Sequence, residues 1–493
     1  MSRVITSREF PRASMPKTLA VLLVLSLSAC VNLAPDYARP QIPTPDTWPE
    51  GPAYQQTLAA RSDSLMVADI GWRDFFLNDR LRQIIEMALE NNRSLRIAAL
   101  NVEKVRAMHQ LQRSQLFPSV DAQGSGTHQR VPGDLSATGE PMTTHVYAAN
   151  IGVSAYEVDL FGRLRNLTEA AQEEFFATEE ARRATQISLV AEVANTFLLL
   201  AADHERLQLA RATLDSQLAS YKLMQKSFEL GSSSALDLRQ AQISVEAARV
   251  DVARYLGQVA MDENALNLLV GAPVPSMLHV DEIPDASAMF SKLPSGIPSA
   301  VLLRRPDILQ AEHRLKGANA NIGAARANFF PSIFLTGGVG TASSALSNLF
   351  KSGTGAWSFI PMITLPIFDA GANTARLESA EADERIAVAS YERVIQGAFR
   401  EVSDALADYG TIDERLSAQR SLEGATTESY RLTDARFKRG ADNYFNVLLM
   451  QRAMYSAQQA TIGVRLAMQA NLITLYKTLG GGWQEQSVMP AGG

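Results

Sequence analysis

The sequence predicts a mainly α-helical protein with a small β part, built from an internal two-fold repeat. A glycine-centred turn occurs twice, at Gly231 and at Gly440, which lie 209 positions apart (440 − 231). Each turn separates two long stretches of helical character, and an internal repeat of this kind determines the architecture of a chain. We therefore expect two long helical hairpins with their tips at equivalent positions.

Proline placement allows these helices to be unusually long. No proline lies between Pro141 and Pro273, or between Pro366 and Pro490. Because proline breaks helix interiors, both tracts can be continuous helices.

Apolar residues within 187–201 form two adjacent stripes at a spacing of three and four residues. Such a broad band is typical of a helix with neighbours on both sides, as in a barrel or bundle of helices. Continuous helices over 165–228 and 374–437 would each be roughly 95 Å long. A long soluble coiled coil is the alternative interpretation, but it does not explain the segments that precede each hairpin.

Two segments with a period of two residues precede the hairpins, at 147–155 and 357–365, and each has a partner segment, at 119–131 and 333–341. A period of two predicts strands with one apolar face. Alternation of apolar with small or polar residues is typical of transmembrane barrel strands. The apolar positions of the first segment are Tyr147, Ala149, Ile151, Val153 and Ala155. The aromatic residues that we assign to the interfacial girdles are Tyr147, Trp357 and Phe359.

The strand number predicts an oligomer. A barrel in a membrane must close, because an open edge leaves backbone groups unpaired in lipid. Single-chain barrels begin at about eight strands, whereas this chain offers one β-hairpin in each repeat. Three copies would supply about 12 strands, so we expect a trimer. The alternative is that these are edge hairpins of a soluble domain.

The N-terminus has the pattern of an export signal. A basic leader is followed by an apolar run at 19–27 and by small residues that lead to Cys30, the only cysteine. The run is too short to span a bilayer. Residues 27–30 resemble the bacterial lipobox, in which cleavage precedes the cysteine and the cysteine then carries lipid, including palmitate. Val31 follows, where lipoproteins held in the inner membrane typically have Asp, so the resemblance favours the outer membrane. A chance cysteine in an ordinary signal peptide is the alternative.

Composition excludes several classes of protein. Removing residues 1–29 changes the formal net charge from −6 to −9, and no Lys/Arg-rich block follows, so we expect no nucleic-acid partner. The mature sequence has no apolar run of about 18 residues and thus no expected transmembrane helix. The six histidines are scattered without metal-ligand spacing. Glu173-Glu174 and Glu179-Glu180 are interpreted as solvated helix faces. We expect no enzyme, no metal and no cofactor other than the lipid on Cys30.

Several further motifs occur in a specific order. They are Pro35-Asp36-Tyr37 after the lipobox, the paired Phe117-Pro118-Ser119 and Phe330-Pro331-Ser332, the strand exits at 158–163 and 365–371, Leu303-Arg304-Arg305-Pro306-Asp307, and the two tips. Over residues 30–482 the chain resembles the outer-membrane factors of tripartite efflux and secretion systems, the TolC-like proteins, and within them the NodT-type lipoproteins. The resemblance implies a trimer in the Gram-negative outer membrane, with a 12-stranded β-barrel continued by a long periplasmic α-helical barrel.

The resemblance also implies an order of segments. We expect a signal peptide at 1–29, a lipidated extended segment and part of an equatorial belt at 30–78, a first repeat at 79–272 with a β-hairpin at 119–157, a Pro-rich linker and belt at 273–298, a second repeat at 299–482 with a β-hairpin at 332–367, and a disordered tail at 483–493.

By resemblance the trimer is a passive exit duct of multidrug efflux for small toxic compounds. Its partners are a periplasmic adaptor (membrane fusion protein), an inner-membrane pump and outer-membrane lipid. The residues expected to contact the adaptor are Gly231, Ser232, Ser234, Leu236, Asp237, Leu238, Gly440, Asp442, Asn443, Tyr444 and Val447. Protein secretion is the alternative cargo, and a periplasmic lipoprotein adaptor or scaffold is the alternative class.

The gate has two open interpretations. Ser234 and Asp237 have the spacing of a capping box, so Asp237 either caps the returning helix or contributes to a ring of carboxylates that favours cations. The family often carries Asp in the second tip, where this sequence has Asn446 and Leu449. Phe445 and Leu449 are therefore candidates for an apolar constriction, with ordinary helix packing as the alternative.

Overall fold

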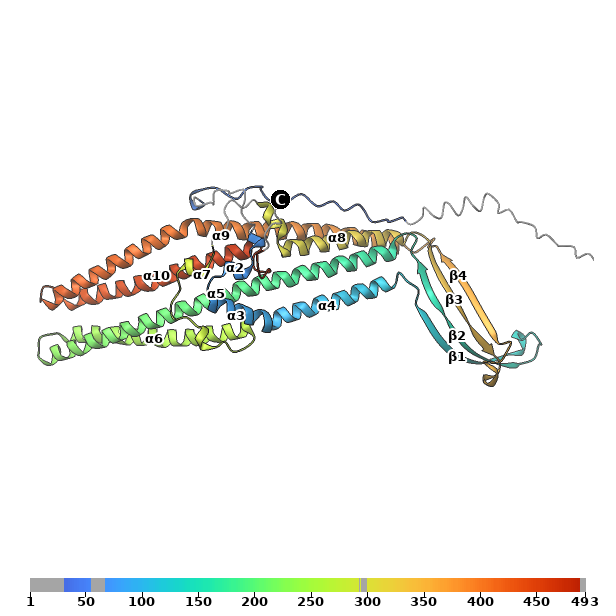
Figure 1. Cartoon of the computed structure of the whole chain (residues 1–493), viewed down its shortest axis with the longest axis horizontal. Helices are drawn as coiled ribbons and strands as arrows, with labels where there is room; N and C mark the ends of the chain where they lie inside the picture. The colour runs from blue at the N-terminus through green and yellow to red at the C-terminus, as the bar shows by residue number, and fades with distance from the viewer. Residues whose placement is uncertain (1–30, 55–66, 292, 294–298, 488–493) are drawn as a thin grey trace, which may run out of the picture. The chain divides into compact units, whose positions relative to one another are not determined.

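The computed structural model describes residues 31–54, 67–291, 293 and 299–487. The predicted signal peptide, the lipidation site Cys30 and residues 488–493 of the predicted tail lie outside the described residues. The helices and strands (Figure 1) are α2 (Trp72–Phe75), α3 (Asp79–Asn91), α4 (Arg93–Ser114), β1 (Val120–Val131), β2 (Met142–Val158), α5 (Arg163–Glu229), α6 (Ala235–Val270), α7 (Ala286–Met289), α8 (Pro306–Ala327), β3 (Ser332–Ser343), β4 (Gly355–Thr364), α9 (Ala372–Lys438) and α10 (Tyr444–Thr478).

The chain divides into two compact units, which we describe separately. The sheet unit consists of Met1–Arg39, Lys104–Phe175 and His313–Val388. The helical unit consists of Pro40–Glu103, Phe176–Glu312 and Ala389–Gly493. Helices α5 and α9 contribute residues to both units.

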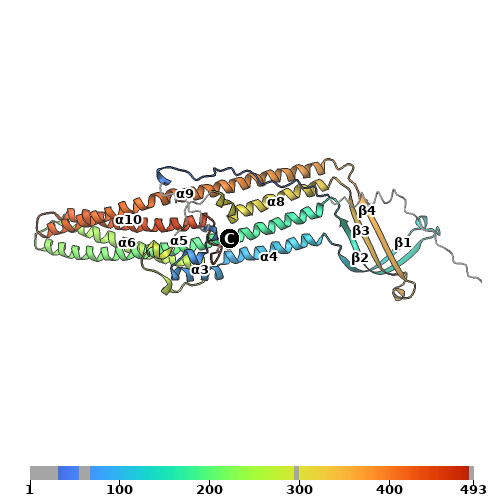
Figure 2. The same ribbon diagram turned by 45° about the horizontal axis from the view of Figure 1, so that its top comes forward.

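The sheet unit contains one four-stranded antiparallel sheet in the order β1-β2-β3-β4. The strands follow one another across the sheet in sequence order, so the two predicted β-hairpins lie side by side (Figure 2). The last residue of β2, Val158, stands opposite Ile333 near the start of β3. The inner pairing joins β2 of the first repeat to β3 of the second repeat. The two halves of the sequence thus share one sheet, although about 170 residues separate the end of β2 from the start of β3.

One part of the predicted strand pattern is wrong. The register between β2 and β3 shifts between Val153 and Tyr156, and Ala155 has a φ of +52° within this irregularity. A β-bulge inserts an extra residue and reverses the alternation beyond it. Ala155 therefore does not continue the apolar stripe of Tyr147 to Val153, and Tyr156, opposite Leu335, takes its place.

In the sheet unit, the environment of the Glu173 carboxylate differs from the prediction. Glu173 on α5 was interpreted as part of a solvated face, but its side chain lies 2.6 Å from Nδ1 of His313 on α8. Both side chains are largely buried, so this contact joins the two helices.

The helical unit contains two hairpins, α5–α6 and α9–α10, which lie side by side in both views (Figures 1 and 2). Helices α5 and α9 each have 67 residues, and α5 begins at Arg163, two residues before the predicted start. The segment before the first β-hairpin forms two helices, α3 and α4, which meet at Asn92. The Asn92 side chain accepts a hydrogen bond from Leu95 N (2.8 Å) at the start of α4. A side-chain cap of this kind explains the break between α3 and α4.

The core of the helical unit is mainly aliphatic and contains one cluster of aromatic rings. Phe75 stacks on Tyr476 with ring centroids 3.9 Å apart, and Phe76 and Phe290 pack around this pair. The Tyr476 hydroxyl donates to Ile70 O (2.7 Å), which satisfies its buried polar group. The segments around 67–77, 274–291 and 479–487 therefore pack together against the long helices.

Residues 483–487, the described part of the predicted disordered tail, make defined contacts. Backbone N of Trp72 donates to Gln484 O (2.9 Å), and Arg73 pairs with Glu485 (2.7 Å). Ser487 donates to the Asp74 carboxylate from both its backbone and its side chain. Residues 483–487 are thus held against α2 by several hydrogen bonds, and for these five residues the prediction of disorder is wrong.

Two further expectations about α5 need correction. Glu180 is buried and forms an ion pair with Arg183 (2.6 Å), so it does not lie on a solvated face. Within the described residues, α5 also includes an 18-residue stretch that is apolar enough to cross a membrane. Because 56% of that stretch is buried, it also fits a core helix.

Candidate functional site: hairpin tips and sheet

The first tip is a tight reversal between α5 and α6. Gly231 has a φ of +72°, and backbone N of Ser232 donates to Ser227 O (2.8 Å). Glycine adopts the left-handed conformation without steric cost and commonly ends helices in this way. Ser234 then accepts from Asp237 N (3.1 Å), and the Asp237 carboxylate accepts from Ser234 N (3.1 Å). The capping box suggested by the sequence is present.

The second tip repeats this geometry 209 positions later. Gly440 has a φ of +74°, and backbone N of Ala441 donates to Arg436 O (2.9 Å). Asn443, the counterpart of Ser234, accepts from Asn446 N (3.0 Å) and begins α10. The repeat is therefore structural as well as sequential.

The two tips place their carboxylate differently. In the second tip Asp442 precedes the cap and accepts from the Asn446 side chain (2.7 Å) and from Asn443 N (2.9 Å). It also lies 3.2 Å from Nε of Arg436. These donors, the Asn446 side chain first, lower the pKa of Asp442. The second tip thus keeps an acid beside the turn although position 446 has none.

Most predicted contact residues of the tips lie at the surface. Gly231, Ser232, Ser234, Leu236, Gly440 and Asn443 are exposed, and Asp237, Leu238 and Asp442 are half-buried. The prediction that Tyr444 and Val447 contact the adaptor is wrong for this chain. Both side chains are buried in a cluster with Met224, Ala241 and Leu448. These two residues hold the hairpins together rather than face a partner.

Exposed apolar side chains also mark the tips. Of the gate candidates, Phe445 and Leu449 are 52% and 48% exposed and Asn446 is half-buried. Leu230 is 84% exposed, and the sequence does not single it out because a leucine at a helix end predicts packing. An exposed leucine beside the turn is a surface that a partner can cover.

The sheet separates side chains onto two faces. Ala122, Ile151, Val339 and Trp357 stand opposite one another in the register of the four strands, so they share a face. The next row, on the other face, holds Gln123, Asn150, Gly340 and Ala356. Tyr147 and Phe359 lie on the same face as Trp357. The second face is not uniformly polar, since it also carries Ile360 and Met362.

The outer strands of the sheet have open edges. Within the described part of the chain, β1 pairs only with β2, and β4 pairs only with β3. All ten residues of β4 are exposed, as are all but the last of β1. Trp357 is 80% exposed. A row of unpaired backbone groups beside an exposed apolar face is a template for pairing with another strand.

Comparisons with known proteins agree with this arrangement. The family model described as outer membrane efflux protein matches residues 84–272 and 297–481. The chain belongs to the outer membrane efflux protein family. It is 48% identical over 475 residues, 96% of this chain and 97% of the relative, both to the toluene efflux pump outer membrane protein TtgC and to the antibiotic efflux pump outer membrane protein ArpC of Pseudomonas putida. The open-state MtrE outer membrane channel of Neisseria gonorrhoeae is 37% identical, with a TM-score of 0.82 over 93% of this chain and 100% of MtrE.

Family membership confirms three expectations from the sequence: an outer-membrane location, the fold and the role of an exit duct for efflux. The two matched segments overlap the repeats predicted at 79–272 and 299–482, and the exact bounds of the repeats stay a prediction. The family is one of efflux proteins and not of enzymes. The narrower assignment to NodT-type lipoproteins stays a prediction.

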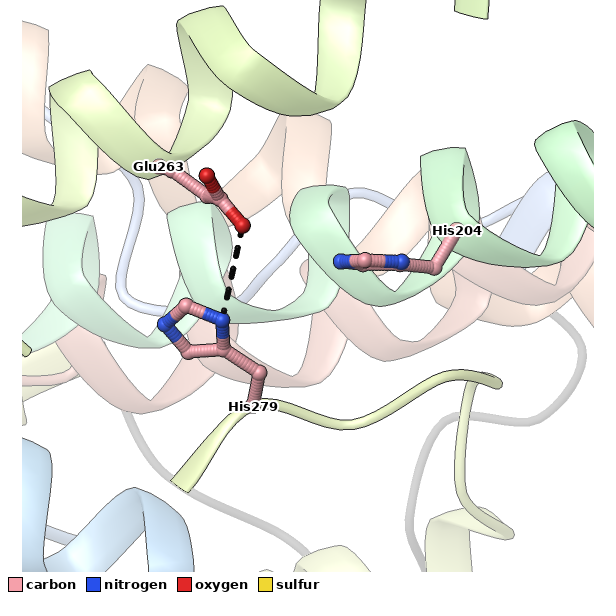
Figure 3. A group of neighbouring side chains, drawn as sticks. All are labelled: His204, Glu263 and His279. Carbon is pink, nitrogen blue, oxygen red and sulfur yellow. Dashed lines mark ion pairs between the residues drawn. The ribbon is translucent and has the colours of Figure 1, made fainter. Parts of the chain in front are cut away.

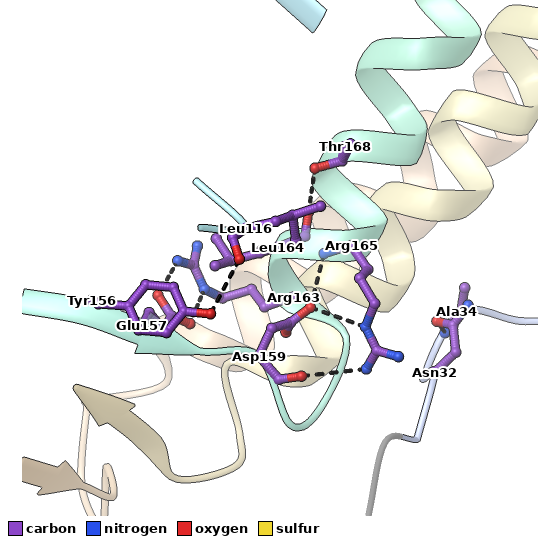
Figure 4. A network of polar contacts seen from close by, with 10 residues as sticks. All are labelled: Asn32, Ala34, Leu116, Tyr156, Glu157, Asp159, Arg163, Leu164, Arg165 and Thr168. Atoms are coloured by element: carbon purple, nitrogen blue, oxygen red, sulfur yellow. Dashed lines mark hydrogen bonds and ion pairs between the residues drawn. The ribbon is translucent and has the colours of Figure 1, made fainter. Parts of the chain in front are cut away.

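The turn between β2 and α5 of this efflux protein is fixed by ion pairs (Figure 4). Arg163 contacts the Glu157 carboxylate with two nitrogens, one of them at 2.8 Å. Asp159 accepts from the backbone N (2.9 Å) and Nε (3.1 Å) of Arg165. A carboxylate at a helix N-terminus satisfies free N–H groups and interacts favourably with the helix dipole. These bonds set the direction in which the chain leaves the sheet.

The motif at 303–307 has a structural role in the helical unit. Arg305 is buried and contacts Asp307 (2.7 Å), Glu401 of α9 (2.8 Å) and Thr478 O at the end of α10 (2.8 Å). Pro306 begins α8, a position where proline is favoured. The motif thus ties the start of α8 to both helices of the second hairpin.

The histidines are not all scattered, which corrects the sequence reading. His204 on α5, Glu263 on α6 and His279 after α6 bring one ligand atom each within 4.8 Å of one another (Figure 3). Beside them, burial raises the pKa of Asp262 to about 6, and the neighbouring Asp203 carboxyl adds to the rise. No local spacing reveals this group, because its members come from three separate segments.

Proposed function

We propose that three copies of this chain close one 12-stranded barrel and conduct small toxic compounds through the outer membrane. The observation that carries this proposal is the sheet with four strands and two open edges. Pairing β4 of one copy with β1 of the next removes every edge after three copies in a barrel of about 12 strands, a size within the known range. One copy alone leaves unpaired backbone groups, which the hydrocarbon of a membrane does not tolerate.

The face that carries Ile151, Val339, Trp357 and Phe359 is proposed to contact lipid. These side chains are exposed in the single chain and apolar, and they share one face across three strands. The row with Gln123, Asn150 and Gly340 faces the lumen in this arrangement. An apolar band outside and polar or small residues inside are the properties of conducting barrels.

The hairpin tips are the proposed docking site for a periplasmic adaptor, which connects the duct to an inner-membrane pump. Support comes from the exposed Leu230, Leu236 and Phe445 beside two rigid turns of equal geometry. Relatives named for toluene and for antibiotic efflux support small toxic compounds as the cargo. Lipid on Cys30 is proposed as an additional anchor, and a mass measurement of the mature N-terminal peptide tests it.

Disulfide cross-linking between edge strands tests the barrel. Because the chain has one cysteine, Cys30, engineered cysteines can be followed individually. Gln123→Cys or Ser125→Cys in β1 is combined with Ala356→Cys or Ser358→Cys in β4, all on the proposed lumen face. We expect oxidation to give covalent dimers and trimers in at least one combination, and nothing larger than a trimer.

Two matched variants interpret the result. The pair Gln123→Cys with Asn150→Cys joins directly opposed residues of one chain and should cross-link without changing its mass. Each single cysteine variant should give at most a dimer. If the internal pair reacts and every β1–β4 combination stays monomeric, or if the products extend beyond three chains, the proposed closure is wrong.

A further inference from the structure

We propose that His204, Glu263 and His279 form a binding site for a divalent transition-metal ion, with Zn²⁺ as the best fit. The ligand atoms of the three residues lie within 4.8 Å of one another. Two imidazoles and one carboxylate are a ligand set that Zn²⁺ accepts, with water in the fourth position. All three residues belong to the helical unit.

The geometry is close to that of a metal site. Two ligand atoms bound to one tetrahedral Zn²⁺ lie about 3.4 Å apart, because each metal–ligand bond is about 2.1 Å. Nδ1 of His279 is already 3.6 Å from the Glu263 carboxylate. Figure 3 shows the His204 ring pointing towards these two side chains. A small rotamer adjustment of His204 therefore completes the site.

A second observation points to a ligand. Nε2 of His204 is buried and has no hydrogen-bond partner among the described residues. A buried polar atom without a partner costs free energy, and a bound cation removes this cost for an imidazole nitrogen. Two cations lie near these residues: Arg206 pairs with Asp203 (2.6 Å), and Arg80 donates to the backbone oxygen of His279 (2.6 Å), so neither guanidinium is directed at a proposed ligand atom.

The site would fasten the segment that joins the two repeats. His279 lies in this segment, whereas His204 and Glu263 lie on α5 and α6. The segment is already attached by buried apolar side chains such as Leu278 and Ile283, and by hydrogen bonds to its backbone: Arg80 donates to His279 O (2.6 Å), and Arg465 donates to Ile283 O (2.6 Å). A metal ion would join three separate segments of one chain and add to its stability.

Metal analysis of the mature protein tests the proposal. The protein, purified in detergent without a histidine tag, is treated with EDTA, desalted, incubated with ZnCl₂ and desalted again. We expect one zinc per chain in the wild type, and loss of that zinc in His279→Gln and Glu263→Gln. His109→Gln and the pair His128→Gln/His145→Gln are matched controls that remove histidines elsewhere and should keep one zinc per chain.

Two further measurements use the wild type alone, so they test the site even if the variants fail to fold. Co²⁺ should give the visible absorption of a tetrahedral site and be displaced by equimolar Zn²⁺, and ZnCl₂ should raise the melting temperature. The proposal is wrong if the wild type retains no zinc, if the folded His279→Gln variant retains as much zinc as the wild type, or if the zinc is lost in the His128/His145 control instead.

Discussion

Asp237 and Asn446 occupy the same position of the two repeated turns, the third residue of the returning helix, yet they bond differently. The Asp237 carboxylate accepts from Ser234 N (3.1 Å) and closes a capping box. The Asn446 side chain instead donates to Asp442 (2.7 Å). In the second tip the acidic residue is Asp442, which directly precedes the capping residue Asn443. This difference bears on which residues gate the duct.

Replacing Asp237 separates its capping role from a gating role. Asp237→Asn keeps an acceptor for Ser234 N and removes the charge. We expect the hydrogen exchange of the first tip to stay close to that of the wild type. We also expect the cation preference in lipid bilayers to remain unchanged, because in the capping role the carboxylate is held at the start of α6 by Ser234 and does not line the constriction. Ser234→Ala, which removes the cap, should cost roughly 0.5–2 kcal/mol of local stability. A large drop in cation preference in Asp237→Asn would favour the gate instead.

Replacing either tip glycine should weaken its turn. Gly231→Ala and Gly440→Ala force alanine into the left-handed region, at a cost of about 1 kcal/mol each. Hydrogen exchange of the tip amides should rise about fivefold accordingly. The control is Gly424→Ala in α9, where a Cβ meets nothing within 4 Å and φ is not positive. It should leave exchange unchanged or slow it, since alanine favours helix. Equal effects at both sites would contradict the turn geometry.

A side chain at Gly340 should disrupt the sheet. A Cβ at this position would overlap the Ala149 carbonyl oxygen of the neighbouring strand. Gly340→Ala should therefore cost about 1–3 kcal/mol and lower the yield of heat-resistant oligomer on gels. Gly124→Ala in β1 is the matched control, because its Cβ meets nothing within 4 Å of this chain. The close approach of β2 and β3 is disproved if both variants give the same yield.

Arg305 should not tolerate lysine. Arg305→Lys keeps the charge but cannot reach Asp307, Glu401 and Thr478 O together. We expect a loss of about 1.5–3 kcal/mol, because hydrogen bonds to a buried charged group are lost. Arg304→Lys, at an exposed ion pair with Asp69, should stay within about 0.5 kcal/mol. Thermal unfolding of both variants measures the difference, and similar losses would argue against a specific role of Arg305.

The second tip should loosen in acid. The folded state lowers the pKa of Asp442, so its bonds stabilise the tip above the pKa of the unfolded state, about 3.9, and this stabilisation is lost as pH falls through the lower folded value. Hydrogen exchange of residues 440–447, corrected for intrinsic rates, should be protected at pH 7 and less protected below about pH 4. Asp442→Ala should show the weaker protection at both pH values. A wild-type tip with equal protection throughout would exclude this role.

The sequence predicts best what depends on neighbouring residues. Gly231, Gly440 and the cap of Ser234 lie within a few positions of the helices they end, so turn chemistry alone places them. The long helices follow from the absence of proline in the same way.

Features that depend on tertiary contacts were missed. The burial of Tyr444 and Val447 arises because the two hairpins pack on each other near their tips, which periodicity along one helix does not reveal. The bulge at Ala155 was missed because alanine usually adopts regular backbone conformations, so nothing in the sequence indicates its positive φ. The group of His204, Glu263 and His279 requires the joining segment to return to α5 and α6.

Electron microscopy of the mature protein in detergent, with its mass determined alongside, tests the central claim most directly. We expect a hollow particle with three-fold symmetry, the mass of three chains, and β4 of each copy paired with β1 of the next. A monomer, a particle of another symmetry or a solid rod without a barrel would contradict the duct described here.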